Sequence, residues 1–306
     1  MVPSGQLSPA TRPHLPAAEI DILELGDLAP EAGWRRPVLL DADLLVLVTG
    51  GHGTAELDFR PLPCRPGTLL RVGPGQVLRC TAQLDATVVR WHGETLRGLD
   101  VDPDAVPTHH QLAGEDEDAV INEVSQLVVD IRRHRGDPAA RSLLRHQLAV
   151  LLLRLALLPS GPTEGTGDAS ADGAAQRAEV DTFRRLCREI EHDYQHTRRV
   201  EDYADRLGCS VRTLTRACLA VTGRSAKQVV DERVALQASR LLAATDEPVA
   251  RIGRRLGFPE PTNFGRFFAR EVGVSPGAFR AAREQPPPRV VRPRRPADPL
   301  TDPGRA

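Results

Sequence analysis

The chain has 306 residues, of which 41% are hydrophobic. This length suits about two domains, and the apolar content excludes global disorder. Residues 1–176 carry a net charge of −9 (15 arginines against 24 acidic residues) and residues 177–306 one of +8 (25 basic against 17 acidic residues), which suggests an acidic module joined to one that can approach a polyanion.

The cysteine content and the hydropathy of the sequence indicate in which cellular compartment the protein is expected. The five cysteines are an odd number and form no CxxC pair. They therefore indicate reduced thiols in a cytoplasmic protein. No apolar segment follows a basic start, so no signal peptide is expected. The most apolar run, Leu148–Leu158, contains Arg154 and is too short to span a membrane, so no membrane partner is expected.

The first part of the chain has the pattern of β-strands. The stretch from Leu44 to Phe59 is an apolar run, a Gly-rich turn and then an alternation of apolar and polar residues. This order predicts a hairpin. Further short strands follow between Gly-Pro turns, in "GTLLRVGPGQVLRC" and "ATVVRW". Many short strands with such turns predict a small barrel or sandwich.

Two helices are expected next. In "EDAVINEVSQLVVDIRRHRG", Val120, Val124, Leu127 and Ile131 fall on one helical face, and Gly136 ends the pattern. The second helix runs from about residue 139 to 158 and is apolar nearly all round. Such a surface must be covered, so we expect a homodimer in which this helix meets a second subunit, with Leu151 and Leu155 as test positions.

Composition changes give the domain boundaries. Residues 159–176 are rich in Gly, Ser, Pro and Asp and have no apolar periodicity, which predicts a flexible linker. Residues 286–306 are rich in Pro and Arg and predict a disordered tail. The expected domains are therefore residues 1–158 and 177–285.

An internal repeat appears after the linker. "VEDYADRLG" (Val200–Gly208) matches "VARIGRRLG" (Val249–Gly257) at an offset of 49, and the residues that follow match at an offset of 50. Each copy predicts a short helix, a turn containing Gly and a second helix, which is a helix-turn-helix unit. A helix over Ala226–Ala244, about 28 Å long, separates the copies and can hold two recognition helices roughly one DNA turn apart.

The second helix of each copy carries residue types that read base edges. In the second copy, Leu256, Phe264 and Phe268 are expected to hold the helix down. Asn pairs with adenine and Arg with guanine through two hydrogen bonds each. No acidic residue lies between Ser210 and Ala220 in the first copy, so its arginines are expected to be unpaired. The candidate DNA-binding residues are Ser210, Arg212, Thr213, Arg216, Thr262, Asn263 and Arg266.

These motifs resemble the DNA-binding domain of AraC/XylS-family transcriptional regulators. The second copy is similar to the family signature in "ARIGRRLGFPEPTNFGRFFAREVGVSPGAFR", and "VEDYADRLGCSVRTLTRACLAVTG" fits the first. The N-terminal "LLVLVTGGHGTAELDFRPLPCRPGTLLRVGPGQ" resembles the cupin-like sensing domain of that family. The chain departs from the pattern at Cys218, where the family usually has a bulky residue, and at Gly265.

The resemblance implies an α+β, two-domain protein with an N-terminal cupin-like β-barrel and an all-α, double helix-turn-helix domain. It implies that six of the candidate residues face the major groove of double-stranded DNA, namely Arg212, Thr213, Arg216, Thr262, Asn263 and Arg266, while Ser210 is expected to cap its helix. It further implies a small-molecule effector bound by residues 1–158, and RNA polymerase as a partner if the protein is an activator. The sequence identifies neither the effector nor its binding residues.

Two other functions stay open. One is a cupin enzyme with a DNA-targeting domain; the other is a protein-interaction module with degenerate helix-turn-helix units. Against the enzyme, His52 and His92 are isolated, His109 and His110 lie in a loop, and no three-residue metal set can be assembled. Motifs for acyl transfer, phosphate binding and zinc hydrolysis are missing as well. We therefore expect a non-enzymatic protein without metal or cofactor.

Overall fold

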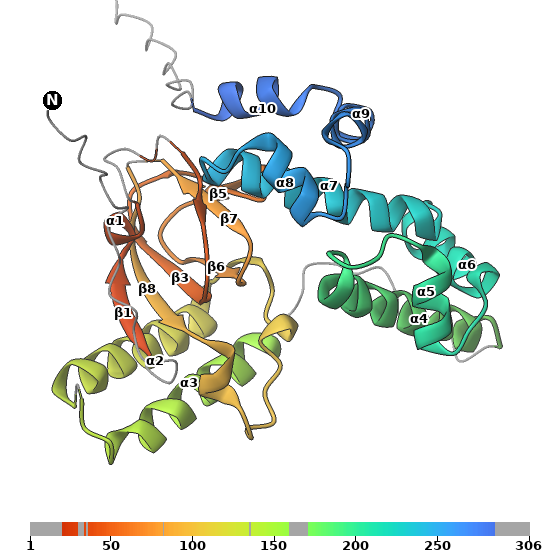
Figure 1. Ribbon diagram of the computed structural model, residues 1–306. Coiled ribbons are helices and arrows are strands. Elements are labelled where there is room, and N and C mark those ends of the chain that lie inside the picture. Colours follow the sequence, from red (N-terminus) through yellow and green to blue (C-terminus); the bar gives the residue numbers. More distant parts are fainter. Residues whose placement is uncertain are drawn as a thin grey trace, which may run out of the picture.

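The protein has two domains, a strand-rich N-terminal one and a helical C-terminal one (Figure 1). The computed structural model describes residues 20–29, 34, 36–81, 83–134, 136–158 and 171–284. This arrangement confirms the α+β, two-domain fold class. The tail expected at residues 286–306 and most of the linker expected at 159–176 lie outside the described residues.

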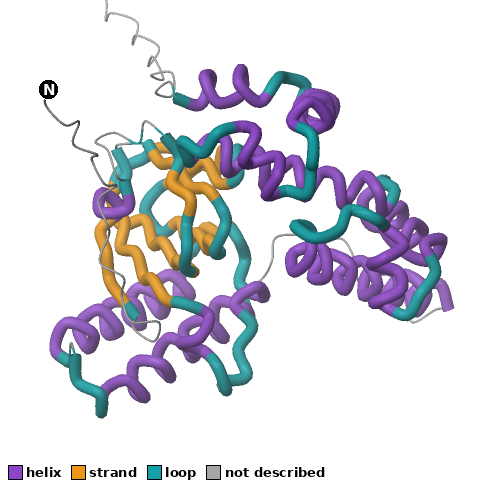
Figure 2. Tube along the Cα trace, in the orientation of Figure 1, coloured by secondary structure: helices purple, strands orange, loops and turns teal. Residues whose placement is uncertain are grey.

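The strands form two antiparallel sheets (Figure 2). One has the order β1-β8-β3-β6-β9 and the other β2-β7-β4-β5, so the described strands do not close into a single barrel. Their bounds are β1 (Asp21–Glu24), β2 (Val38–Leu39), β3 (Asp43–Gly50), β4 (Gly53–Leu57), β5 (Arg60–Cys64), β6 (Thr68–Val72), β7 (Val77–Cys80), β8 (Asp85–Trp91) and β9 (His109–Gln111). A short helix α1 (Leu25–Leu28) and two 3₁₀ turns (Gly93–Leu96 and Pro103–Ala105) complete the sheet region.

The hairpin predicted over Leu44–Phe59 is wrong. β3 pairs with β6 and β8, whereas β4 pairs with β5 and β7 in the other sheet. The chain changes sheets at the Gly-rich turn, where Gly51 has a φ of 76° and a Cβ would lie 1.8 Å from the Gln83 carbonyl oxygen. A turn signal between two strands therefore does not show that they pair. The tight hairpin is β4–β5, which turns through Asp58 and Phe59 at φ values of 48° and 68°.

Strand β3 is buried on both faces, and its side chains alternate between two cores. Leu44 and Val46 lie in the cluster between the sheets, while Leu45 and Leu47 lie in a second cluster against helices α2 (Gly114–Arg133) and α3 (Ala140–Ala156). The face of α2 predicted from periodicity is confirmed, because its four apolar residues are the buried ones.

The prediction that Leu151 and Leu155 of α3 face a second subunit is wrong. Leu151 and Leu155 are buried in the domain's own core, with exposed fractions of 1% and 0%. The exposed apolar residues of this segment are instead Leu143, Val150, Leu153 and Leu157. Periodicity could not distinguish the two sides, because both are apolar.

The C-terminal domain consists of α4 (Ala171–Asp193), α5 (Val200–Leu207), α6 (Val211–Thr222), α7 (Ala226–Ala244), α8 (Val249–Arg255), α9 (Pro261–Val272) and α10 (Pro276–Arg283). Helix α7 has the predicted bounds. Helix α4 begins at Ala171, inside the stretch expected to be a linker, so the described part of that stretch is helical.

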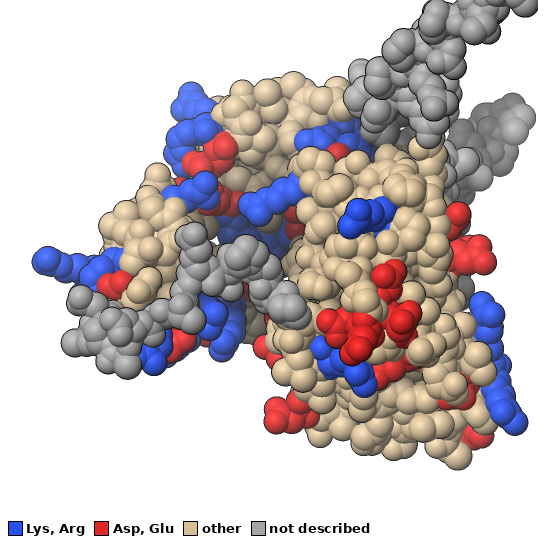
Figure 3. Space-filling model, turned by 180° about the vertical axis from the view of Figure 1, so that it is seen from behind, with Lys and Arg blue, Asp and Glu red and all other residues tan. Residues whose placement is uncertain are grey.

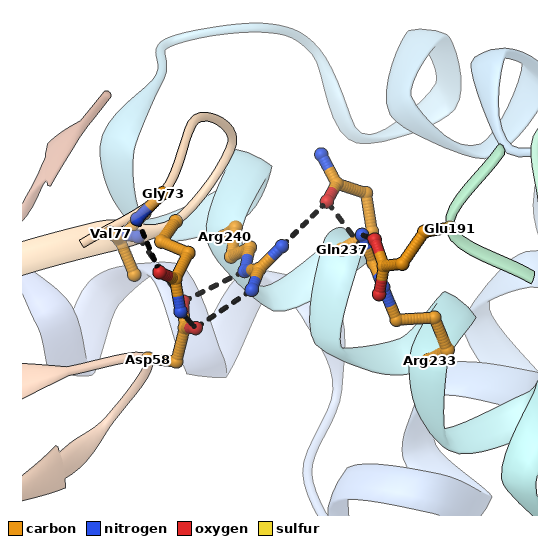
Figure 4. A network of polar contacts seen from close by, with 8 residues as sticks. Asp58, Gly73, Val77, Glu191, Arg233, Gln237 and Arg240 are labelled. Carbon is orange, nitrogen blue, oxygen red and sulfur yellow. Dashed lines mark hydrogen bonds and ion pairs between the residues drawn. The ribbon is translucent and has the colours of Figure 1, made fainter. Parts of the chain in front are cut away.

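The two domains contact each other through the β4–β5 turn and α7 (Figure 4). Asp58 accepts hydrogen bonds from Arg240 Nε at 2.8 Å and Nη2 at 2.7 Å, and both side chains are largely buried. Gln76 and the Val77 backbone also donate to Asp58. Phe59 packs edge-on against Phe279 of α10, with 5.4 Å between ring centroids.

Candidate nucleic-acid interface

A turn that contains a glycine in the left-handed backbone conformation precedes each recognition helix. In the first unit, Gly208 ends α5 with a φ of 64°, and the Ser210 hydroxyl caps α6 by accepting from the Thr213 backbone N–H at 3.1 Å. In the second unit, Gly257 has a φ of 76° and Pro261 opens α9. Glycine tolerates this backbone without steric cost, and proline suits the first helical turn. The two units thus reach similar geometry through different starting signals.

The repeat seen in the sequence is also a repeat of burial. Helix α6 buries Leu214, Ala217 and Cys218, and α9 buries Phe264, Phe267 and Phe268 at positions 50 residues later. Glycines with positive φ end both helices, at Gly223 and Gly273. Because equivalent positions are buried, equivalent positions are also presented to solvent.

Six of the seven candidate residues are exposed and Thr213 is half-buried, all of them on the start and outer face of α6 and α9. Arg216 and Arg266 occupy equivalent exposed positions. The structure therefore brings the candidate residues of each unit together on one helix face, as a DNA-reading surface requires.

The first unit differs from expectation at one arginine. Arg216 Nε lies 3.0 Å from Glu179 Oε1 of α4, so the expectation that it is unpaired is wrong. The acidic partner lies on α4, 37 residues before Arg216 in the chain, and not within α6. Arg212 and Arg266 have no ion-pair partner within residues 171–284. The Ser210 and Thr213 hydroxyls lie 2.9 Å apart.

In the second unit, the recognition residues line a basic groove. This groove has a volume of about 1010 Å³, and Asn263 and Arg266 form part of its wall with Arg198, Lys227 and Arg270. Asp231 partly offsets the positive charge by pairing with Lys227 and Arg270. Arg198 is held in place, since its Nη2 donates to the Gly257 carbonyl at 3.1 Å and its guanidinium lies over the Phe258 ring. The predominance of basic side chains along this groove is compatible with a phosphate backbone.

Charge is distributed unevenly over the molecule. On the face shown in Figure 3, Lys and Arg side chains gather over the helical domain and in the hollow between the domains, and acidic side chains form a patch on the strand-rich domain. On this face, basic side chains are thus concentrated on the helical domain and beside it, although the strand-rich domain also carries some, and this distribution agrees with the charge asymmetry of the sequence.

The described residues hold no group of three or more His, Cys, Asp or Glu side chains placed to bind a metal ion. Across the same residues, no helix is both long and apolar enough to cross a membrane.

Sequence reasoning missed Glu179 because its partner is distant in the chain. One signal could have indicated it. Ala217 and Cys218 are small at positions where the second unit has Phe267 and Phe268. Small residues on a buried face indicate that a neighbouring helix packs closely, and α4 packs along α6.

Comparison with known proteins gives one family and several relatives. Residues 203–282 match the family described as a helix-turn-helix domain. The HTH-type transcriptional activator RhaS of Escherichia fergusonii is 23% identical over 247 residues, covering 78% of this chain and 85% of the relative. The arabinose operon regulatory protein of Escherichia coli is 42% identical over 55 residues, which is 18% of each chain.

Similar solved structures include an apo form of ToxT from Vibrio cholerae and the DNA-binding domain of AdpA bound to a target DNA. The ToxT structure shares 11% identity and covers 88% of this chain and 99% of its own, with a TM-score of 0.41. The AdpA domain shares 34% identity and covers 33% of this chain and 90% of its own, with a TM-score of 0.30.

Proposed function

We propose that this chain, a member of the AraC family of transcriptional regulators, reads two successive major-groove segments of one DNA site with α6 and α9 and does so under control of a small-molecule effector. The observation that carries the proposal is the matched pattern of burial and exposure on the two helices. On this basis we propose that Arg212, Thr213 and Arg216 read one segment and that Thr262, Asn263 and Arg266 read the next.

Selection of bound sequences from a random DNA pool tests this proposal. We expect two short preferred elements roughly one helical turn apart, because α7 is about 28 Å long and separates the two units. A protein-interaction module with degenerate units would enrich no sequence. Enrichment of a single element would show that only one unit reads bases.

We propose the N-terminal domain as the binding site of the effector. A groove of about 460 Å³ lies between β1, β8 and α2, and its wall includes Glu24, Asp27, Thr87 and Arg132. This mixed charge suits a small polar molecule, which we propose as the effector class. A thermal-shift screen of small sugars, amino acids and carboxylic acids checks it. A compound that stabilises the wild-type protein but not Arg132→Ala supports this site, whereas equal stabilisation of both would mean that the effector binds elsewhere.

The ion pair between Asp58 and Arg240 connects the N-terminal domain to the helix that joins the two DNA-reading units (Figure 4). Arg240 lies on α7, and α7 sets the spacing of α6 and α9. We therefore propose that Asp58 and Arg240 transmit the effector's state. Asp58→Arg places two positive charges together, which should separate the domains and change DNA affinity, although neither residue touches DNA. The double variant Asp58→Arg/Arg240→Asp should restore the wild-type affinity. Unchanged affinity in the single variant contradicts the role.

Homodimerisation is proposed through the exposed side of α3. His146, Val150, Leu153 and Leu157 are exposed at intervals of four, three and four residues, and Leu143 continues the series. This spacing is that of a coiled-coil seam, which a second copy of the same helix can cover. Val150→Glu and Leu153→Glu should therefore give monomers in sedimentation, whereas Val274→Glu, at an exposed valine of the C-terminal domain, should not.

The relatives are named as transcriptional regulators, which favours a non-enzymatic role over a cupin enzyme. The five cysteines are free thiols, which supports the proposed cytoplasmic location. RNA polymerase is the proposed protein partner if the bound site lies upstream of an activated promoter.

A further inference from the structure

The ion pair between α4 and α6 connects a helix outside the helix-turn-helix unit to its central recognition residue. Glu179 Oε1 lies 3.0 Å from Arg216 Nε. Arg216 is 69% exposed, while Glu179 is only 23% exposed. The carboxylate therefore lies mostly under neighbouring groups, whereas the guanidinium projects into solvent.

The atom that Glu179 contacts matters for base reading. A guanidinium has five N–H donors in a planar fork. Glu179 forms an ion pair at Nε, at the base of the fork, and Arg216 has no further ion pair and donates no hydrogen bond within residues 171–284. Both terminal nitrogens therefore remain available. Two parallel donors are what the O6 and N7 acceptors of guanine require.

Orientation of the fork affects specificity as well as affinity. A free arginine side chain samples many rotamers, and much of this freedom is lost when it binds a base. A carboxylate that already fixes the side chain reduces that loss for the one base whose acceptors match. We infer that Glu179 is a positioning residue, which orients Arg216 for guanine in the first DNA segment. This inference rests on the proposed reading of DNA by α6.

A competing effect acts in the opposite direction. Glu179 is negatively charged and lies close to where phosphates would pass, so it repels DNA in general. If Glu179 only occupied Arg216 and kept it from DNA, its removal would strengthen binding to every sequence. If it positions Arg216, its removal weakens binding mainly at the guanine. The two roles thus predict opposite results.

The second unit offers an internal control. Arg266 occupies the position equivalent to Arg216 but has no carboxylate partner within the described C-terminal domain. A change at Glu179 should therefore leave the base preference of the second segment as it is. A general loss of folding or affinity would affect both segments.

The test compares base-by-base binding profiles, from a random DNA pool, of the full-length wild type, Glu179→Ala, Glu179→Gln and Arg216→Ala. The preference for guanine in the first segment should fall about three- to tenfold in Glu179→Ala, at the same position that Arg216→Ala relaxes. Glu179→Gln keeps an oxygen acceptor and should lose less. Asp181→Ala removes the same charge from the same helix, where Asp181 is exposed and pairs only distantly with Arg184, and should leave the preference unchanged.

A double-mutant comparison makes the result specific. In an Arg216→Ala background, Glu179→Ala should have no further effect on base preference, because the residue it positions is gone. Stronger binding of Glu179→Ala to all sequences, or the same loss in both backgrounds, would overturn the inference. If the wild type itself selects no sequence, the proposed function fails instead, so the two failures are distinguishable.

Discussion

The two helix-turn-helix units share a backbone plan but build it with different cores. The second unit is held by aromatic rings, since Phe264 and Phe268 are fully buried and Phe268 meets Phe279 edge-on with 5.5 Å between centroids. The first unit uses Leu214, Ala217 and Cys218 at equivalent positions. Burial raises the pKa of the Cys218 thiol to about 11, so the side chain stays neutral and packs as a small apolar group.

This difference shows how one motif adapts to its neighbours. Helix α4 lies along α6, and the small side chains of α6 let it approach closely. Rings fill the corresponding space beside α9. Close approach of α4 also brings Glu179 to Arg216. Core composition in the first unit is therefore linked to the environment of Arg216, whereas Arg266 in the second unit has no such neighbour among the described residues of its domain.

The largest expected effect is a loss of aromatic packing in the second unit. Phe268→Ala should lower the free energy of unfolding by about 3–5 kcal/mol, through lost burial and the cavity left behind. Cys218→Ala at the equivalent position should cost only about 1 kcal/mol, since a single sulfur is removed. Chemical denaturation followed by far-UV circular dichroism measures both. Equal costs would mean that the two cores contribute alike and would remove the basis of the comparison.

The next effect concerns base readout. Arg266→Ala should cost about 1–3 kcal/mol at its preferred DNA site and relax the preference at one position, and Arg216→Ala should do the same roughly one helical turn away. Asn263→Ala should act within the Arg266 segment alone. Base-by-base binding profiles of the single variants show whether these side chains read bases. A uniform loss at every position would show that these arginines contact phosphates.

A comparable loss of stability is expected when the first unit receives a phenylalanine at the position equivalent to Phe268. Cys218→Phe should destabilise the protein by about 1–3 kcal/mol, because α4 leaves no room for a ring at this fully buried position. Leu219→Phe adds a ring at the adjacent, half-exposed position and should be nearly neutral. Denaturation of the two variants is the measurement. Stabilisation by Cys218→Phe would show that the first unit is loosely packed and that α4 does not constrain it.

Features set by residues close together in the chain could be predicted from the sequence, and features set by distant contacts could not. The bounds of α7, the apolar face of α2 and the repeat were predictable, because caps, glycines and periodicity act within a few residues. The pairing of β3 with β6 and β8 was not, since a Gly-rich turn suits both a hairpin and a change of sheet. The Glu179–Arg216 pair depends on how two helices pack. The small Ala217 and Cys218 indicate a close neighbour of α6, but they do not identify Glu179 as the partner of Arg216.

The smallest effect concerns how the two recognition helices begin. Ser210 caps α6 through its hydroxyl, whereas Glu260 makes no side-chain cap to α9. Ser210→Ala should therefore cost about 1 kcal/mol of stability, and Glu260→Ala close to nothing. Ser210→Gly should cost only a few tenths of a kcal/mol, because glycine is itself a good N-cap residue. The pair of variants also separates capping from DNA contact. If the hydroxyl binds DNA directly, Ser210→Ala and Ser210→Gly should weaken DNA binding equally although their stabilities differ. If it only caps the helix, the loss of DNA affinity should follow the loss of stability and be smaller for Ser210→Gly.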